Sequence, residues 1–367
     1  MSKVLILGAG FSGATAAYLL EKKGHDVTVL EGDATPGGGT WTRFYGGHPY
    51  TFGPRIFFTR DEEVIDHMKS MVKMRTFFTK SWTYVESDQQ FHNYPIQEAD
   101  LVLMKDYKKI AMEIKKTKKK TPSVENFEAY WLDAIGPTLY EKFVNHYSKK
   151  MWGVDSNKEL VADFEWVNRG TPIRTKDNRL YTDQFQGYPE NINGYNPYFE
   201  KALKHVKTLF GCYIKSFDAE KRIVHTTKGD FTADIIINTI HVDTLFSNAY
   251  GKLRYCGRDF LKVMLPIEQA LPKEMTWIHY SGEESFTRIT EFKKITNHRS
   301  PHTLLGIEIP SKNGRYYPVQ SPPELRRYEQ YQTLYPKNFF SIGRLGTFKY
   351  KGIVDAIRES LDLAKQL

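Results

Sequence analysis

Residues 4–13, VLILGAGFSG, place a glycine motif directly behind a short apolar run. The run over 3–7 predicts a buried parallel strand, and the apolar positions after Gly13 have the spacing of a helix. In a GxGxxG pattern the glycines permit a tight turn and let a pyrophosphate approach the start of that helix. Glu31, at the end of a second predicted strand over 26–32, is placed to accept the ribose hydroxyls of an adenosine. The unit therefore predicts a dinucleotide-binding domain of the Rossmann type.

A second glycine cluster follows in GDATPGGGTWTR, residues 32–43. Flavoproteins of the glutathione-reductase class have extra glycines at this place, which approach the cofactor phosphates. The chain closes on SIGRLGTFKYKGIVDAIRES, residues 341–360, where a strand is predicted to end near Gly343 and a helix to begin near Gly352. These segments favour FAD over NAD. Because the sequence has no second GxGxxG, we expect an external reductant such as NAD(P)H to bind transiently.

Composition and charge limit the class of protein. The chain has 367 residues, of which 40% are hydrophobic and 26% charged, as is ordinary for a globular protein of two or three domains. A net charge of +9 favours anionic partners such as phosphorylated small molecules. The sequence contains no zinc-finger or RNA-binding signature, so we do not expect nucleic acid as a partner. With only two cysteines, we expect neither a disulfide framework nor a metal site, and a reducing cytoplasm is the expected location. We see no signal peptide and no apolar run of membrane-spanning length, so we expect no integral membrane segment. The oligomeric state stays open, with a homodimer among the alternatives.

The rest of the chain predicts two insertions into the first domain. Residues 61–76 and 100–150 have helical periodicity, whereas 82–86, 90–96 and the region after Arg174 have strand-like patterns. The expected α/β fold is a Rossmann-type FAD-binding domain built from both chain ends, with an inserted helical domain and an antiparallel β-sheet domain. The predicted boundaries are 1–75, 196–245 and 331–367 for the FAD-binding domain, 98–160 for the helical domain, and 76–97, 161–195 (with a mobile arginine loop) and 246–330 for the β-sheet domain.

Six segments, in the same order, resemble the UDP-galactopyranose mutase family along nearly the whole chain. They are the N-terminal glycine motif, YSKKMWG at 147–153, TPIRTKDNRLYTDQFQGYP at 171–189, FTRITEF at 286–292, YYPV at 316–319 and GRLGTFKY at 343–350. The resemblance rests on the set and its order, because any single segment is unspecific.

The resemblance implies an activity and a cofactor state. Members of the family convert a nucleotide-activated hexopyranose to its furanose without net redox change, yet they need reduced FAD. The flavin N5 attacks the anomeric carbon, the nucleotide diphosphate leaves, and the sugar closes through its 4-hydroxyl before the diphosphate returns. For this chain the implied substrate resembles UDP-galactose, with a 6-deoxy or N-acetyl hexose as plausible as galactose. Galactofuranose formed this way would serve polysaccharide biosynthesis.

The resemblance also implies roles for single residues. Arg174 and Arg288 fall on the family's two diphosphate-binding arginines, whose guanidinium forks bind phosphate oxygens in a bidentate way. Tyr317 and Tyr350 match its phosphate-contacting tyrosines. We expect the loss of either arginine to reduce activity far more than stability. The polar segment NRGTPIRTKDN around Arg174 predicts a loop, which in the family is a mobile lid.

Further matches concern the nucleobase, the sugar and FAD. Phe143 and Tyr147, four residues apart on one predicted helix face, match the aromatic pair that packs on uracil. Trp152 matches a pocket tryptophan near the sugar. The expected FAD contacts are Gly8, Gly10, Phe11, Ser12, Gly13, Glu31, Gly38, Gly39, Thr40, Arg344, Gly352 and Ile353.

Four positions depart from the family. Its members carry GAHIFHT where residues 53–59 are GPRIFFT, so Arg55 and Phe58 replace two histidines beside the flavin and the sugar. Gly352 replaces an aspartate, and Phe185 stands where a tyrosine is usual. We predict that Arg55, Phe58 and Phe185 contact the substrate. Arg55 would then meet a substrate or cofactor phosphate or a sugar carboxylate, and the alternative is a salt bridge with a nearby acidic residue.

Two other functions compete with the mutase. An FAD-dependent oxidoreductase of the amine-oxidase type would share the cofactor domain, but it would show a net two-electron change and would not need paired arginines and tyrosines. A degenerate FAD-binding homologue with a structural role is the third alternative, which the lost histidines keep open.

Overall fold

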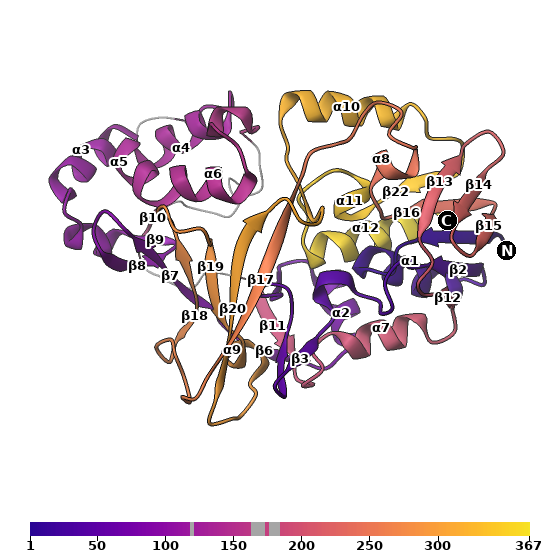
Figure 1. Ribbon diagram of the computed structural model, residues 1–367, viewed down its shortest axis with the longest axis horizontal. Coiled ribbons are helices and arrows are strands. Elements are labelled where there is room, and N and C mark those ends of the chain that lie inside the picture. The colour runs from indigo at the N-terminus through magenta and orange to yellow at the C-terminus, as the bar shows by residue number, and fades with distance from the viewer. Residues whose placement is uncertain (118–120, 163–172, 176–183) are drawn as a thin grey trace.

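The computed structural model describes residues 1–117, 121–162, 173–175 and 184–367, and Figure 1 shows an elongated molecule with both termini at one end. A five-stranded parallel sheet at that end has the order β12-β2-β1-β16-β22. Its strands span Lys207–Leu209, Asp26–Leu30, Lys3–Leu7, Ile235–Asn238 and Phe339–Ser341. The central strands are apolar and buried over Val4–Leu7 of β1 and Ile235–Ile237 of β16, as expected where both faces of a parallel sheet are covered.

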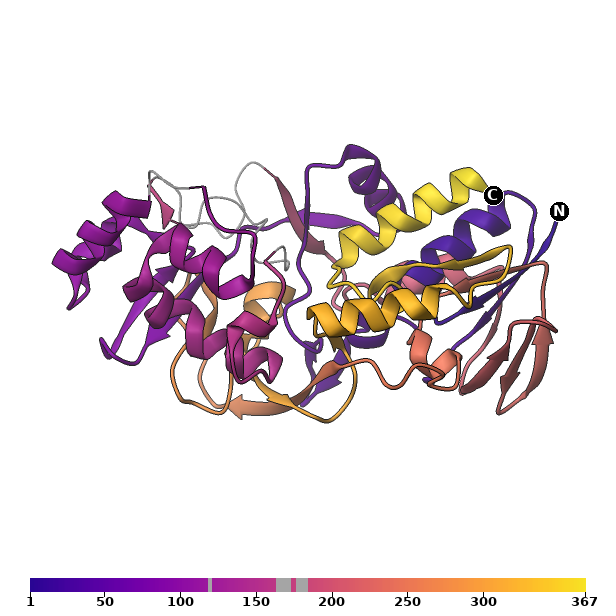
Figure 2. The same cartoon turned by 90° about the horizontal axis from the view of Figure 1, so that it is seen from above.

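Helices from both chain ends pack beside this sheet. α1 (Phe11–Lys22) follows the glycine motif, and α12 (Ile353–Gln366) closes the chain next to it, as Figures 1 and 2 both show. Alanines on α1 let the two helices approach closely, and the Ser360 hydroxyl donates to the Ser12 carbonyl at 2.9 Å. The prediction of a Rossmann-type domain assembled from both chain ends is confirmed.

A seven-stranded sheet lies beside the Rossmann-type domain, in the order β21-β17-β20-β19-β18-β7-β8. Its strands span Tyr317–Pro318, Tyr255–Leu265, Thr303–Ser311, Arg288–Glu291, Met275–Tyr280, Lys80–Val85 and Gln90–Tyr94. All neighbours are antiparallel except β18 and β7. This sheet is the expected antiparallel part of the fold, and it carries Arg288 and Tyr317 on two of its strands.

Helices cover the far end of the molecule (Figure 1). They are α3 (Tyr107–Thr117), α4 (Phe127–Ile135), α5 (Pro137–Tyr140), a π-helical turn (Glu141–Asn145) and α6 (His146–Trp152). The other helices are α2 (Glu62–Met71), α7 (Asn196–Leu203), α8 (Val242–Leu245), α9 (Phe292–Thr296), α10 (Pro322–Gln332) and α11 (Gly343–Gly346). Among the described residues, no helix combines the length and the apolar composition that crossing a membrane demands.

Four small sheets complete the described part of the fold. They are β5-β11-β6 (Phe57–Thr59, Phe185–Pro189, Met74–Thr76), β13-β14-β15 (Ile214–Asp218, Ile223–Thr226, Gly229–Thr232), β3-β4 (Arg43–Tyr45, His48–Tyr50) and β9-β10 (Ile96–Gln97, Ile173–Arg174).

Two local predictions differ from the structure. Residues 74–76 were expected to continue a helix but form β6, because Val72 leaves helical geometry and the chain then pairs with β11. Residues 173–174 were expected in a loop but pair in parallel with β9. Apart from Thr175, the remainder of the predicted mobile arginine loop lies outside the described residues, and the predicted domain boundaries stay predictions.

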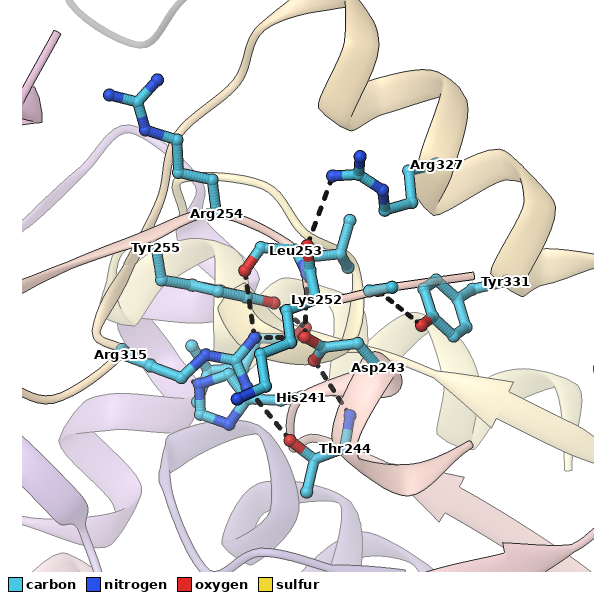
Figure 3. A network of polar contacts seen from close by, with 12 residues as sticks. His241, Asp243, Thr244, Lys252, Leu253, Arg254, Tyr255, Arg315, Arg327 and Tyr331 are labelled. Carbon is cyan, nitrogen blue, oxygen red and sulfur yellow. Dashed lines mark hydrogen bonds and ion pairs between the residues drawn. The ribbon is translucent and has the colours of Figure 1, made fainter. Parts of the chain in front are cut away.

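A polar network fixes the loop that precedes Tyr317 to the Rossmann-type domain (Figure 3). The Asp243 carboxylate is buried after β16, pairs with Arg315 and accepts the Leu253 amide at 2.9 Å. His241 Nε2 donates to the Arg315 carbonyl at 2.7 Å, and the Arg315 guanidinium lies 4.6 Å above the Tyr255 ring. Arg315 is two residues before Tyr317. The network therefore ties the segment that carries this tyrosine to the Rossmann-type domain.

Candidate functional site

A cavity of about 1630 Å³ opens between the glycine motif and the seven-stranded sheet. Its lining comes from the first helix, the second glycine cluster, β19, β21 and the start of α12. A pocket for one drug-sized ligand usually has about 300–1,000 Å³. The cavity is therefore large enough for a dinucleotide and a second ligand together.

The cofactor end of the cavity is built from backbone. Gly10, Phe11 and Ser12 at the start of α1 line it, together with Gly38, Gly39 and Thr40, and with Gly352 and Ile353 at the start of α12. A Cβ on Gly10 or Gly38 would meet no atom within 4 Å, so the cavity extends up to the backbone there. Two helix N-termini facing one space favour a phosphate group. This cradle fits the pyrophosphate of FAD.

Gly8, Gly13 and Glu31 support the glycine turn from behind and do not line the cavity. A Cβ on Gly13 would lie 1.9 Å from the Gly8 carbonyl oxygen, so only glycine allows this packing. The Glu31 carboxylate accepts the Ala9 amide at 2.6 Å and the Asp33 amide at 2.8 Å. Burial raises the pKa of Glu31, although these hydrogen bonds oppose the shift. Its predicted contact with an adenosine ribose stays a prediction.

We expect the purified protein to be yellow and to release FAD on acid denaturation, because neither cysteine lines the cavity and the sequence shows no obvious flavinylation context. Gly13→Ala should lower the bound flavin per chain strongly, since the new methyl group displaces the turn that supports the pyrophosphate. Flavin absorbance per mole of protein measures both. A colourless protein that takes up no FAD on reconstitution would contradict the assignment.

The substrate end of the cavity contains a buried ion pair. Arg288 on β19 donates from Nε and Nη2 to the two oxygens of Glu308 on β20, at 2.7 and 2.8 Å. Burial lowers the pKa of Arg288, but the Glu308 charge outweighs it and raises that pKa above its ordinary value. The bidentate pair fixes the plane of the guanidinium group and leaves Nη1 for a ligand.

Tyr317 and Tyr350 form an aromatic wall next to this pair. Their rings stack with centroids 5.5 Å apart, and Arg344 lies 4.8 Å above each ring. Burial raises the pKa of the Tyr317 phenol, but the positive charges of Arg55, Arg344 and Arg258 outweigh burial and lower it to about 8. A phenol held among guanidinium groups is an anion-binding arrangement.

We expect one tyrosine to titrate near pH 8 in the ligand-free protein, because the folded-state pKa of Tyr317 is about 8 and its ordinary value is 10.0. Since the unfolded chain keeps this proton to higher pH, the stability that Tyr317 contributes develops as pH rises from about 8 to 10 and is lost as pH falls through 8. Ultraviolet difference spectroscopy of tyrosinate measures the titration. Tyr317→Phe should remove it and Arg55→Gln should move it to higher pH. A titration that persists in Tyr317→Phe would assign it elsewhere.

Arg55 and Phe58 both line the cavity. Arg55 Nη2 lies 3.5 Å from the Tyr317 hydroxyl, and the Tyr195 hydroxyl donates to the Arg55 carbonyl at 2.8 Å. Within the described residues no carboxylate lies at ion-pair distance from Arg55, and the nearby Glu308, whose charge raises the pKa of Arg55, pairs with Arg288. The alternative of a simple salt bridge therefore has no support in the described structure.

Phe143 and Tyr147 lie at the opposite end, beside a small adjoining cavity of about 30 Å³. Tyr147 lines both cavities, as do Tyr94 and His279, and the Tyr147 and His279 rings meet edge to face with centroids 5.6 Å apart. Phe143 is buried in the π-helical turn. Tyr147 thus presents an aromatic ring at the edge of the arginine-rich cavity, and the predicted packing of Phe143 and Tyr147 on a nucleobase stays a prediction.

Besides Phe143, two further predicted substrate residues lie outside the lining of the main cavity. Trp152 is fully buried behind the tyrosine wall, with ring centroids 6.3 Å from Tyr317 and 5.6 Å from Tyr350. Phe185 packs against Phe57 at 6.0 Å instead of facing the cavity. In contrast, Arg174 lines the cavity, at the end of β10.

Sequence reasoning missed Glu308, Arg258, Tyr94 and His279, which all line the cavity. For Glu308 a signal existed. Leu304, Gly306 and Glu308 occupy the buried phase of β20, and an acidic residue in that phase indicates a buried cationic partner. For Arg258, Tyr94 and His279 the sequence pattern offered no comparable signal, because polar and aromatic residues also occur on exposed strand faces.

The fold and the site define a protein with a dinucleotide-binding domain of the Rossmann type and an arginine-rich second ligand site that faces the cofactor-binding glycines. A family model described as UDP-galactopyranose mutase matches residues 142–350, and one for an NAD(P)-binding Rossmann-like domain matches residues 6–71. Since the first covers more than half of the sequence, the chain belongs to the UDP-galactopyranose mutase family. This membership and the fold imply FAD as the cofactor.

Individual proteins agree with this assignment. A protein of Escherichia coli named dTDP-fucopyranose mutase is 26% identical, over 100% of this chain and 98% of its own length. A protein of Mycoplasma pneumoniae named UDP-galactopyranose mutase is 24% identical, over 99% of this chain and 95% of its own length. A crystal structure of reduced UDP-galactopyranose mutase has the same fold, with a TM-score of 0.83, 17% identity and coverage of 100% of this chain and 95% of the other.

Proposed function

We propose that this protein interconverts the pyranose and furanose forms of a hexose carried on a nucleoside diphosphate. One observation carries the proposal. A cluster of arginines and tyrosines faces the cofactor-binding glycines across a single cavity of about 1630 Å³. A dianionic leaving group and a flavin can therefore lie on either side of one reacting sugar. The oxidoreductase alternative is weaker, because it does not require this phosphate-binding set and the relatives aligned over the whole chain are mutases.

The diphosphate would be held by four side chains. Arg174 and Arg288 supply guanidinium donors, and the tyrosine wall of Tyr317 and Tyr350 supplies hydroxyl groups. Glu308 keeps Arg288 in one orientation, so little conformational entropy is lost when the phosphate binds. Because the leaving group must return to the same sugar, tight retention of the diphosphate shortens the lifetime of the reactive sugar.

When bound in its reduced form, FAD supplies the nucleophile for the anomeric carbon. The protein contributes position and protection from water. Arg55 lies between Gly39 on the cofactor side and Tyr317 on the sheet side. These three residues would bound the space for the sugar. Aromatic rings on the sheet side limit the access of water to a ring-opened sugar. We further propose action in the cytoplasm, where both free cysteines suit a reducing environment and NAD(P)H can serve as transient reductant.

A substrate panel tests the proposed function. Dithionite-reduced enzyme is incubated with UDP-galactose, UDP-N-acetylgalactosamine, dTDP-fucose and UDP-galacturonic acid, and the products are separated by chromatography. We expect at least one substrate to give a product of unchanged mass and different retention. Products that differ by two hydrogens would instead favour the oxidoreductase.

A further inference from the structure

The segment that carries Tyr317 is anchored to the Rossmann-type domain through Arg315, two residues before it. The Arg315 guanidinium pairs with the buried Asp243 carboxylate, and its Nη1 donates to the Thr244 hydroxyl at 3.0 Å. The Arg315 carbonyl accepts from His241 Nε2 at 2.7 Å. These partners follow β16, which pairs with β1 in the parallel sheet. Both the main chain and the side chain of Arg315 are therefore fixed to the domain that carries the glycine motif (Figure 3).

The Asp243 carboxylate is a rigid partner for this arginine. Its side chain is 0% exposed, and each of its oxygens accepts one backbone amide, at 2.9 and 3.0 Å. Such a carboxylate holds a guanidinium group in one orientation, because it cannot turn without losing those hydrogen bonds. Arg315 also lies 4.6 Å above the ring of Tyr255, and the strand of Tyr255, β17, pairs with β21. These contacts fix the strand that carries Tyr317 relative to the Rossmann-type domain.

Arg55, which faces the Tyr317 hydroxyl, is held by different contacts. The Tyr195 hydroxyl donates to the Arg55 carbonyl at 2.8 Å, and the Tyr195 ring meets the Phe11 ring of α1 edge to face, with centroids 5.4 Å apart. Arg55 Nη2 lies 3.5 Å from the Tyr317 hydroxyl, beyond the usual range of a hydrogen bond. Since the two residues are anchored independently, their separation depends on the position of β21. At this distance a small displacement of β21 changes the interaction strongly.

We propose that Arg315 is a positioning residue of the substrate site, which acts by holding the Tyr317 hydroxyl among the guanidinium groups of Arg55, Arg258 and Arg344. Arg315 does not itself line the cavity, so its effect on a ligand passes through Tyr317. The inference rests on the proposed function for the identity of the ligand, whereas the contacts that carry it belong to the ligand-free protein.

Paired variants test this role without leaving a charge buried alone. Arg315→Met with Asp243→Asn removes the ion pair, and the asparagine oxygen can still accept the Leu253 amide. The matched control is Arg327→Met with Glu324→Gln, which removes an arginine–carboxylate pair at the edge of the same network (Figure 3). The two arginine side chains are 32% and 33% exposed, so the two pairs of changes are comparable. Arg327 belongs to α10 and not to the strand that carries the tyrosine.

Tyrosinate titration of the oxidised, FAD-loaded enzyme is the first measurement, because it reports the surroundings of the Tyr317 hydroxyl without any substrate. Burial and the negative Glu308 raise the pKa of Tyr317, and the positive Arg55, Arg344 and Arg258 outweigh them. The Arg315→Met, Asp243→Asn variant should move the midpoint upward, toward the ordinary value of 10.0, because the hydroxyl loses its set position beside Arg55. The control pair should leave the midpoint unchanged. Flavin bound per chain shows that each variant keeps its cofactor domain.

Titration calorimetry with UDP is the second measurement. The Arg315→Met, Asp243→Asn variant should weaken UDP binding about 3- to 10-fold, as for one displaced hydrogen bond. In a Tyr317→Phe background the same change should have little further effect, because the hydroxyl that Arg315 positions is gone. Arg315→Lys, which keeps a positive charge beside Asp243, should recover part of the affinity.

Three results would overturn the inference. They are an unchanged tyrosinate midpoint in the Arg315→Met, Asp243→Asn variant, an equal upward shift in the control pair, and a loss of UDP affinity that is just as large in the Tyr317→Phe background. If the first variant fails to bind FAD, an unchanged midpoint in Arg315→Lys counts against the inference in its place. UDP that does not bind the unmodified enzyme would reject the proposed substrate, while the tyrosinate shift still decides the role of Arg315, so the two failures are distinguishable.

Discussion

Arg288→Ala is expected to lower the free energy of unfolding by roughly 3–5 kcal/mol as well as to abolish measurable turnover. The substitution leaves the Glu308 carboxylate, whose side chain is only 6% exposed, without its bidentate partner. From the sequence we expected both diphosphate-binding arginines to affect activity far more than stability. The ion pair changes this expectation for Arg288 and not for Arg174. Denaturant unfolding of the FAD-loaded enzyme, beside initial rates, measures both effects.

Two variants separate the role in stability from the role in binding. Arg174→Ala should reduce kcat/KM by about 10- to 100-fold, as for one charge-assisted contact with phosphate, with a small change in unfolding. The double variant Arg288→Met with Glu308→Leu should recover most of the stability that Arg288→Ala loses, because no unpaired charge remains buried. It should stay inactive. An active double variant would remove Arg288 from the diphosphate site.

The oxidised enzyme is expected to be inactive, and reduction by dithionite should start a reaction in which product greatly exceeds the reductant consumed. This follows because the oxidised ring lacks the nucleophilic lone pair that the proposed reaction needs, whereas the reaction itself transfers no electrons overall. Anaerobic rates measured against flavin absorbance test the first part. The amount of NAD(P)H oxidised per mole of product tests the second.

The control for this experiment is enzyme reoxidised by air, which should lose activity and regain it on renewed reduction. One mole of NAD(P)H consumed for each mole of product would instead show net redox turnover and support the oxidoreductase.

The cofactor-binding half of the protein was predictable from the sequence because its signals are local. A strand, a glycine turn and a helix are adjacent in the chain, and their spacing alone predicts the cradle that Gly10 and the start of α1 form. The helix start predicted near Gly352 is confirmed for the same reason, since α12 begins at Ile353 and its signal is again local. The predicted α/β class is confirmed on this basis.

The substrate end depends on contacts between distant residues. Arg288 and Glu308 are neighbours because β19 and β20 pair in antiparallel register, which no local pattern specifies. Trp152 matched a motif, yet it lies behind the tyrosine wall, because sequence shows which residue type is present and not which side of a ring it packs against. The surroundings of Arg55 likewise come from segments more than 250 residues apart, as its contact with Tyr317 shows.

The most direct test of the mutase activity is to approach its equilibrium from both sides. Reduced enzyme is given either the pyranose or the furanose form of the sugar nucleotide that the panel identifies, and NMR follows the anomeric signals. We predict that both reactions end at the same ratio of ring forms, that the ratio does not depend on the amount of reductant, and that oxidised enzyme changes neither sample. A ratio that depends on the starting form or on the reductant supplied, or a product whose mass differs from that of the substrate, would contradict the proposed function.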